Sequence, residues 1–313
     1  MDYRDIRIVF MGTPEFAVAS LDALVKAGCT IVGVITAPDK PAGRGMRMQE
    51  SAVKKYAVEK GLPVLQPEKL KNPEFLDTLR SLKADLQVVV AFRMLPELVW
   101  NMPPMGTVNV HGSLLPQYRG AAPINWAIIN GENETGVTTF KLQHEIDTGH
   151  ILMQEKITIG DDETAGEVHD RMKETGAQLL VRTIQALATG SLEEKPQSEF
   201  SSSSGIEIKH APKIFNETCK INWDSSVHDI HNLIRGLSPF PGAFTQLNGK
   251  MLKIYRSAKE VKMPSQKTGE FETDHKSYLK FAAHDGYIMV KELQMEGKKR
   301  MQVEDFLRGY RFE

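Results

Sequence analysis

Apolar residues in the first half of the chain gather in short runs, and segments with helical spacing separate most of them. Continuous apolar runs are typical of buried parallel strands, and their alternation with helices is typical of a Rossmann-like sheet. The predicted strands are 6–11, 30–36, 62–65, 86–91, 107–111, 136–142 and 151–159. The predicted helices are 15–27, 49–60, 72–82, 95–100, 123–129 and 164–189. We therefore expect an α/β domain with a mostly parallel sheet.

A different pattern begins near residue 190. Residues 190–210 contain Pro196 and a run of four serines at 201–204, which predicts a linker. One amphipathic segment, 225–237, then precedes several β-rich runs separated by glycines, and a helical turn is expected at 304–307. The β-rich runs are 243–247, 251–257, 269–273, 278–282 and 288–295. This spacing predicts a small antiparallel β-barrel of the oligonucleotide-binding (OB-like) type. The expected organisation is an α/β domain over 1–189, a linker over 190–210 and a β-barrel domain over 211–313.

Composition and chain ends point to an ordinary globular protein. Hydrophobic residues make up 41% and charged residues 25% of the chain, and no apolar run reaches transmembrane length. The first twelve residues form a charged turn leading into a strand, so we expect no signal peptide and no membrane partner. Cys29 and Cys219 are far apart and lack metal-ligand spacing, which indicates reduced thiols in a cytoplasmic protein. Nothing in the sequence demands more than a monomer.

The charge distribution is slightly asymmetric. The net charge is −1, but residues 206–313 carry four more positive than negative side chains, and the rest of the chain carries five more negative ones. An excess of positive charge in the C-terminal part suggests that it faces a polyanion. The alternative is that so small a difference has no meaning, and charge alone slightly favours this alternative.

A loop over 37–48 is rich in proline, glycine and cations, with Lys40, Arg44 and Arg47. Such loops suit contact with phosphates, since lysine and arginine bind the nucleic-acid backbone whatever its sequence. A solvated surface loop is the alternative, and it would be favoured if the loop stood alone. The turn after the first strand has one glycine, Gly12, instead of three, so a dinucleotide cofactor is not expected.

Candidate chemistry lies at the ends of two predicted strands. Asn109 and His111 alternate along one strand and so share a face, and Asp147 follows the next strand. An amide donor, an imidazole and a carboxylate together suit acyl transfer, in which an amine attacks a carbonyl and loses a proton. No Gly-x-Ser-x-Gly elbow surrounds Ser113, so no covalent nucleophile is implied. Each residue alone has a structural alternative: a core histidine, a turn-capping asparagine, and an aspartate turn before Gly149.

Two groups of residues could be interpreted as metal ligands. His144, Asp147 and His150 form one group, and His228 and His231 on a predicted helix form the other. Neither matches a well-defined ligand spacing, so we expect surface histidines and no metal.

Several motifs together resemble the folate-dependent formyltransferases. They are 109–124 (NVHGSLLPQYRGAAPI), 146–149 (IDTG), 10–16 (FMGTPEF), 38–45 (PDKPAGRG), 66–67 (QP), 221–223 (INW) and 234–243 (IRGLSPFPGA). The motifs are spread along the chain from residue 10 to residue 243, and the first is highly specific for the superfamily. The basic loop and the second domain point to the branch that acts on methionyl-tRNA.

The resemblance implies transfer of the formyl group of 10-formyltetrahydrofolate to the amine of methionyl initiator tRNA. By position, the implied catalytic residues are Asn109, His111 and Asp147. The implied folate-binding residues are Ser113, Leu114, Leu115 and Pro116. The implied tRNA-binding residues are Lys40, Arg44 and Arg47, together with the β-barrel, and Phe16 is implied to line the methionine pocket.

The chain departs from the family in one loop, and other functions stay open. The family often has a Tyr-Gly pair before the Leu-Pro that follows the central strand, but residues 91–96 here read AFRMLP. We expect Arg93 to change the details of the folate contacts. Formylation of an amino sugar nucleotide, hydrolysis of formyltetrahydrofolate and catalytically inactive RNA binding are the alternative functions.

Overall fold

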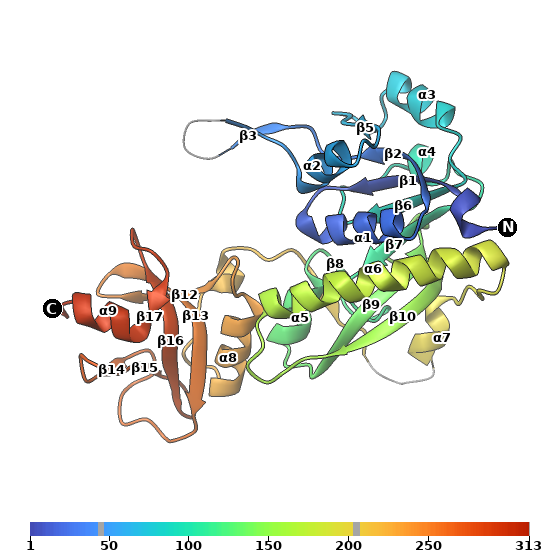
Figure 1. Ribbon diagram of the computed structural model, residues 1–313. Helices are drawn as coiled ribbons and strands as arrows, with labels where there is room; N and C mark the ends of the chain where they lie inside the picture. Colours follow the sequence, from blue (N-terminus) through green and yellow to red (C-terminus); the bar gives the residue numbers. More distant parts are fainter. Residues whose placement is uncertain (43–46, 203–206, 313) are drawn as a thin grey trace. The chain divides into compact units, whose positions relative to one another are not determined.

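The structure is a computed structural model that describes residues 1–42, 47–202 and 207–312. The chain folds into two compact units (Figure 1). The first comprises Met1–Arg119, Gly136–Ile157 and Asp170–Lys209, and the second comprises Gly120–Thr135, Thr158–His169 and His210–Glu313. Two segments from the predicted α/β region therefore group with the C-terminal part.

The first unit is built on the expected sheet. Its strands are β1 (Arg7–Gly12), β2 (Thr30–Ile35), β5 (Val64–Leu65), β6 (Leu86–Val90), β7 (Thr107–His111), β9 (Glu134–Lys141) and β10 (Ile151–Thr158). They lie in the order β10-β9-β7-β6-β1-β2-β5. Neighbours from β7 to β5 are parallel, whereas β9 is antiparallel to β7. All seven predicted strands are confirmed, and the sheet is mostly parallel.

The predicted helices of this sheet are also confirmed, with small shifts of their ends. They are α1 (Glu15–Lys26), α2 (Ala52–Glu59), α3 (Pro73–Ser81), α4 (Glu97–Trp100) and α6 (Ala165–Thr189), and a short 3-10 helix, η1 (Tyr3–Asp5), precedes β1. The N-caps explain the starts of two of them. The hydroxyl of Ser51 accepts from Lys54 N at 3.0 Å, and the amide oxygen of Asn72 accepts from Glu74 N at 2.9 Å. Such caps satisfy backbone N–H groups that have no partner within the helix.

Helices pack on both faces of the sheet, and this fixes the direction of the candidate catalytic residues. Met11, Val89 and Asn109 occupy neighbouring positions on adjacent strands and share one face. On the opposite face, a Cβ on Gly176 of α6 would lie 3.2 Å from Val110 and 3.3 Å from Val137. Because α6 approaches β7 so closely on that side, side chains at 109 and 111 point to the other side.

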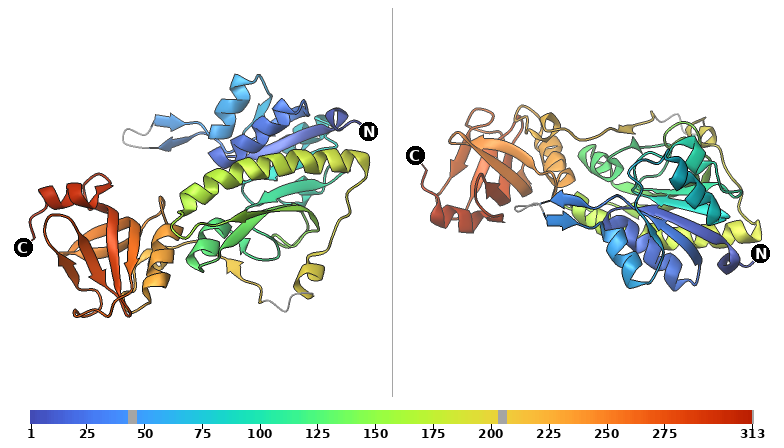
Figure 2. Two further views of the ribbon diagram at one scale, coloured as in Figure 1. Left: turned by 60° about the horizontal axis from the view of Figure 1, so that its bottom comes forward. Right: turned by 90° about the horizontal axis from the view of Figure 1, so that it is seen from above.

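The basic loop is structured at both ends, so the prediction of a loop over 37–48 is wrong there. Strands β3 (Lys40–Ala42) and β4 (Arg47–Gln49) pair antiparallel and extend from the first unit (Figure 2). Three-residue strands are too short to show alternation, and Pro41 lacks a backbone donor, so no strand is indicated by the residue pattern. Residues 43–46, including Arg44, lie outside the described residues.

Hydrogen bonds among four residues anchor the base of this hairpin. Gln66 Nε2 donates to the carboxylate of Asp39 at 2.7 Å and to Ala37 O at 2.8 Å, and Lys54 Nζ donates to the same carboxylate at 2.5 Å. The hydrogen bond from Lys54 lowers the pKa of Asp39 below its usual value. The Gln66-Pro67 motif of the sequence therefore stabilises the start of the basic hairpin.

The expected linker is also partly structured. Within 190–210, Lys195 exchanges backbone hydrogen bonds with Ile151, at 2.8 and 3.0 Å, and helix α7 covers Gln197–Ser202. The linker prediction included no helix at these residues, because a short polar helix carries no apolar periodicity to reveal it. Residues 203–206, which hold half of the serine run, lie outside the described residues.

The second unit contains the predicted β-rich region. Its strands are β12 (Ala243–Leu247), β13 (Lys250–Glu260), β14 (Phe271–Thr273), β15 (Leu279–Ala282), β16 (Tyr287–Met295) and β17 (Met301–Gln302). They form an antiparallel sheet in the order β12-β13-β16-β15-β14, with β17 on β16. The five predicted runs are confirmed, and the curled sheet fits the OB-like prediction. A buried core that includes Leu252, Phe281 and Leu293 fills it.

Helices complete the second unit. They are α5 (Pro123–Ile129), α8 (Val227–Gly236), α9 (Val303–Gly309) and the short 3-10 helix η2 (Glu217–Cys219), while β8 (Arg119–Gly120) pairs with β11 (His210–Ala211). Gly236 lets α8 approach α5, because a Cβ there would lie 2.6 Å from Ile129 Cγ1 and 3.2 Å from Asn125 O. The predicted helix 225–237 and the helical turn 304–307 are confirmed as α8 and α9.

Two buried polar residues of α8 tie it to the turn before α6. Arg235 is 5% exposed, and its guanidinium donates to Gly160 O at 3.1 Å and Glu163 O at 3.2 Å. Burial lowers the pKa of Arg235. His231 is 2% exposed, with Nε2 3.3 Å from Asp161 O and Nδ1 3.0 Å from the Ser257 hydroxyl, so the prediction that it is a surface histidine is wrong. Its spacing from Val227 and Ile234 places it on the buried face of the helix.

Both thiols are free and buried, and burial raises the pKa of Cys29 to about 11 and also raises that of Cys219. Since the thiolate is the reactive form, the native protein is expected to react with Ellman's reagent far more slowly than the unfolded chain. The absorbance at 412 nm in buffer and in guanidinium chloride measures this difference. Equal rates in the two conditions would contradict the burial.

Candidate active site

His111 ends β7 and is held on two sides. Its Nε2 lies 2.9 Å from the carbonyl oxygen of Tyr118, and its ring meets the edge of Phe140 at a centroid distance of 6.4 Å. A carbonyl oxygen can only accept, so Nε2 carries the hydrogen. The residue is 8% exposed. Nδ1 is therefore the nitrogen of His111 that can exchange a proton with a neighbour.

Asp147 lies opposite that nitrogen. It belongs to the loop between β9 and β10, and its Oδ2 is 3.8 Å from Nδ1 of His111. The side chain of Asp147 is 14% exposed and that of His111 is 9% exposed, so both are largely shielded from solvent. Asp147 adopts a left-handed backbone with φ of 55°, an unusual conformation for a residue other than glycine. The structure thus brings together two of the three residues singled out in the sequence.

Asn109 stands two residues before His111 on the same strand and face. Its backbone is paired between Val89 of β6 and Phe140 of β9. The side chain is half-buried, and within the described part of the chain no hydrogen bond to its carboxamide is found. A fixed amide with free donors beside an imidazole is able to bind a carbonyl oxygen.

The segment after β7 is a tight turn that uses some of its own side chains. The Ser113 hydroxyl donates to Gln117 O at 2.6 Å, and Leu115 is 1% exposed in a small core with Phe140 and Ile151. Leu115 N also donates to the Thr138 hydroxyl at 3.1 Å. The side chains of Ser113 and Leu115 therefore stabilise the turn. Leu114 is half-buried and Pro116 is buried, and contact of residues 113–116 with folate stays a prediction.

The atypical loop after β6 is fastened by its arginine. The guanidinium of Arg93 donates to Glu68 O at 2.8 Å and to Pro67 O, which joins this loop to the one after β5. A cavity of about 500 Å³ opens beside it. Its lining is Leu70, Lys71, Arg93, Met94, Leu95, Pro96, Glu97 and Leu98. The cavity has an apolar wall, two cations, Lys71 and Arg93, and one carboxylate, Glu97.

The remaining predicted residues are placed as follows. Lys40 is exposed on β3, Arg47 lies on β4 opposite Ala42, and Arg44 is outside the described residues. Phe16 is half-buried in the first turn of α1, after the carboxyl end of β1. Among described residues, no three His, Cys, Asp or Glu side chains are grouped as metal ligands would be. No described helix is both long and apolar enough to cross a membrane.

Sequence reasoning missed Arg119 and Gln197 as parts of this site. Gln197 is 4% exposed and bonds to the backbone of the Asp147 loop, and Arg119 bonds to Gln197. Arg119 belongs to the 109–124 motif, so the sequence could have indicated a role for it. Gln197 lies in the expected linker, 50 positions from Asp147, and no sequence pattern there indicates a role in the site.

Comparison with known proteins identifies both parts of the chain. The family profile described as "Formyl transferase" matches residues 6–184, and "Formyl transferase, C-terminal domain" matches residues 213–311. A methionyl-tRNA formyltransferase of Parabacteroides distasonis is 55% identical over 99% of this chain and 98% of its own length. One from Bacteroides fragilis is 51% identical over 99% and 97%, and one from Porphyromonas gingivalis is 48% identical over 99% and 97%.

Solved structures share the fold at much lower identity. The N-formyltransferase of Helicobacter canadensis, in complex with folinic acid and dTDP-3-aminofucose, aligns with a TM-score of 0.66 at 22% identity, over 95% of this chain and 100% of that one. HypX of Aquifex aeolicus, in complex with tetrahydrofolic acid, aligns with a TM-score of 0.65 at 16% identity, over 98% and 48%. These structural similarities show the fold alone. The relatives that are 55% and 51% identical over 99% of this chain show which group of formyltransferases it belongs to. The chain therefore belongs to the methionyl-tRNA formyltransferase family.

Proposed function

We propose that this formyltransferase moves the formyl group of 10-formyltetrahydrofolate onto the α-amino group of methionyl initiator tRNA, with Asn109, His111 and Asp147 around the reacting carbonyl. The family membership supports the reaction and its acceptor. The observation that carries the site is the 3.8 Å distance between Asp147 Oδ2 and His111 Nδ1. Beside them, the carboxamide of Asn109 makes no hydrogen bond to any described residue, so it is available to bind a ligand.

The chemistry follows from these groups. The amine nitrogen bonds to the formyl carbon, the bond from that carbon to N10 of the folate breaks, the amine loses one proton and N10 gains one. Asn109 donates to the formyl oxygen as negative charge develops on it, and His111 donates to the same oxygen from Nδ1 in its protonated form, since the Nε2 hydrogen is held by Tyr118 O. Asp147 stabilises positive charge on the imidazole during the reaction and accepts the amine proton through water. No covalent enzyme intermediate is needed.

Folate binding is proposed at the turn 113–116 and at the cavity beside residues 93–98. An apolar wall suits the flat pterin and aminobenzoyl rings, and cations such as Lys71 and Arg93 suit the glutamate carboxylates. Phe16 is proposed to contact the methionine side chain. We place the enzyme in the cytoplasm as a monomer, with the catalytic domain over 1–189, the linker over 190–210 and the tRNA-binding barrel over 211–313.

The acceptor is tested directly with labelled 10-formyltetrahydrofolate. Charged initiator tRNA, an amino sugar nucleotide and water are offered as alternative acceptors in parallel reactions. Label in methionyl-tRNA at the highest kcat/KM supports the proposal. Preferred formylation of the sugar, or release of formate, would replace it with one of the other formyl-transfer functions. Binding of tRNA without any affinity for folate would indicate an RNA-binding protein.

The basic hairpin is expected to control affinity for tRNA. Replacing both Lys40 and Arg47 by alanine should raise KM for methionyl-tRNA about tenfold, because the variant loses two cations that are proposed to contact phosphates of the tRNA backbone. The slope of log(kcat/KM) against log[salt] should flatten by roughly 0.7–0.9 for each phosphate, and KM for folate should stay the same. A charge-matched control replaces Lys55 and Lys60 of the α2 region, both exposed. Equal effects in the two double variants would refute a specific role for the hairpin.

A further inference from the structure

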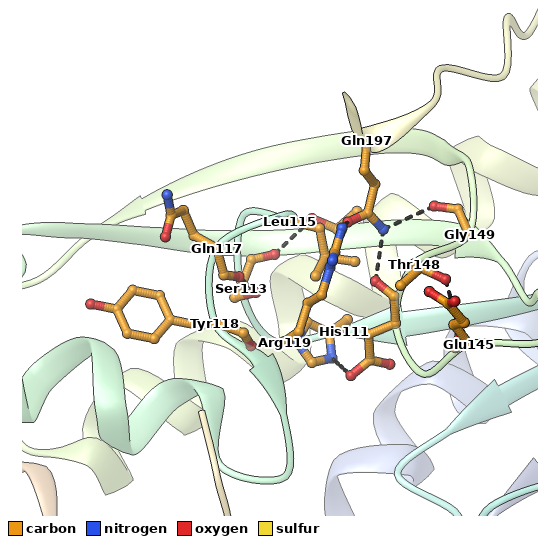
Figure 3. A network of polar contacts seen from close by, with 12 residues as sticks. His111, Ser113, Leu115, Gln117, Tyr118, Arg119, Glu145, Thr148, Gly149 and Gln197 are labelled. Atoms are coloured by element: carbon orange, nitrogen blue, oxygen red, sulfur yellow. Dashed lines mark hydrogen bonds and ion pairs between the residues drawn. The ribbon is translucent and has the colours of Figure 1, made fainter. Parts of the chain in front are cut away.

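The amide of Gln197 is saturated by groups around the candidate site. Nε2 donates to Asp147 O at 2.8 Å and to Gly149 O at 2.9 Å (Figure 3). Oε1 accepts from Nε of Arg119 at 2.9 Å and from Nη2 of the same guanidinium at 2.5 Å. A carboxamide offers two donor hydrogens and two acceptor lone pairs, and all four are used. Carbonyls only accept and guanidinium only donates, so the orientation of the amide is fixed.

These hydrogen bonds hold a turn in which Asp147 has an unfavourable backbone conformation. Asp147 has a φ of 55°, and the left-handed region is costly for residues with a Cβ unless surrounding contacts hold them there. Gln197 holds the carbonyls on either side of Thr148, and the Thr148 hydroxyl closes the turn by donating to Glu145 O at 3.0 Å. Without the Gln197 amide, one main constraint on the conformation of Asp147 would be gone.

The segment that contains Arg119 also holds the imidazole of His111. Arg119, which holds Gln197, directly follows Tyr118, whose carbonyl oxygen lies 2.9 Å from His111 Nε2. One short segment of chain therefore fixes the imidazole through its backbone and the turn of Asp147 through a side-chain bridge. The separation of the imidazole and carboxylate, 3.8 Å, depends on both.

We propose that Gln197, oriented by Arg119, is a positioning residue that sets the catalytic geometry of Asp147 relative to His111. The inference rests on the proposed role of Asp147 in formyl transfer. A group displaced by about 1 Å from its reacting partner can lower the rate about 10²-fold, so a bridge outside the reacting atoms is able to affect turnover. Because Gln197 touches neither substrate in this proposal, its replacement should change kcat and not KM.

Gln197→Glu is the sharpest test, because it preserves size and the contact to Arg119. It removes both donors and sets a carboxylate against two carbonyl oxygens. We expect kcat to fall about ten- to a hundredfold, with KM for folate and for methionyl-tRNA within about threefold of the native values. Gln178→Glu, at an exposed position of α6, is the matched control and should leave kcat unchanged. Arg119→Lys, which keeps the charge but removes the forked guanidinium, should show a milder fall of the same kind.

A double-variant cycle separates positioning from general support of the fold. In an Asp147→Asn background there is no carboxylate to place, so adding Gln197→Glu should change kcat by less than about twofold. If Gln197→Glu alone has near-native kcat, or if its full effect multiplies with that of Asp147→Asn, the positioning role is overturned while the proposed reaction stands. If Asp147→Asn itself retains native kcat, the proposed role of Asp147 fails, and the positioning role fails with it. Circular dichroism and thermal unfolding of each variant verify that the folded protein is being assayed.

Discussion

Replacing His111 with alanine is expected to lower kcat for formyl transfer by about 10²–10⁴-fold. The variant lacks the general acid–base group and one of two proposed donors to the formyl oxygen. The fold should survive, because the substitution removes only one hydrogen bond to Tyr118 O, worth about 1 kcal/mol, and the edge contact of the ring with Phe140. Initial rates with saturating folate and methionyl-tRNA measure kcat, and thermal unfolding checks the fold.

An exposed histidine provides the control for this experiment. His228 lies on α8 with its side chain in solvent, and His228→Ala should keep kcat within about twofold of the native enzyme. Asn109→Ala should lower kcat about 10²–10³-fold, as expected for one donor to a developing oxyanion. The two effects should not multiply when both residues are replaced, since groups that act on one oxygen act as a unit. Native turnover in His111→Ala would remove the imidazole from the mechanism.

Gly149→Ala is the second variant with a large expected effect. A Cβ at Gly149 would lie 1.6 Å from Lys141 O and 3.2 Å from Phe140 Cδ2. The first of these clashes is with backbone, so no side-chain rotation relieves it, and the turn holding Asp147 must move away from β9. A displacement of that order should lower kcat at least 10²-fold. Overpacking of this kind should also reduce the free energy of unfolding by about 1–3 kcal/mol.

Gly160→Ala tests whether any glycine replacement has this effect. At Gly160 the nearest atom to an added Cβ is 3.5 Å away, an ordinary contact, so both kcat and stability should stay close to native. Comparing the two variants by steady-state kinetics and chemical denaturation isolates the close approach of the turn to the strand. Native kcat in Gly149→Ala would mean that the position of the Asp147 turn does not limit the reaction.

The sequence was most informative about elements with many apolar positions. Strand 86–90 is buried along its whole length, and its apolar run was sufficient to predict it. The strands on either side of the basic loop were not predictable in the same way, since three residues with Pro41 among them show no period. The burial of His231 could have been predicted from its helical spacing relative to Ile234.

The candidate site was predictable in its residue types but not in its construction. Alternation along β7 placed Asn109 and His111 on one face before the fold was known. The position of Asp147 depends on a left-handed residue and on Gln197, which is 50 residues away in the sequence. Such an interaction depends on tertiary structure, and no local pattern near Asp147 encodes it. Likewise, the hydrogen bond to Tyr118 O, which fixes the proton on Nε2 of His111, requires the full turn after β7.

The central claim is that the formyl group binds where Asn109, His111 and Asp147 converge. A crystal structure of the protein with a stable formyl-bearing folate tests it most directly. The claim predicts the formyl oxygen at about 2.7–3.2 Å from the Asn109 amide nitrogen and from Nδ1 of His111. It also predicts that one water can bridge the carboxylate of Asp147 to the position from which the amine attacks the formyl carbon. A formyl group seated beyond hydrogen-bond distance of both Asn109 and His111 would contradict it.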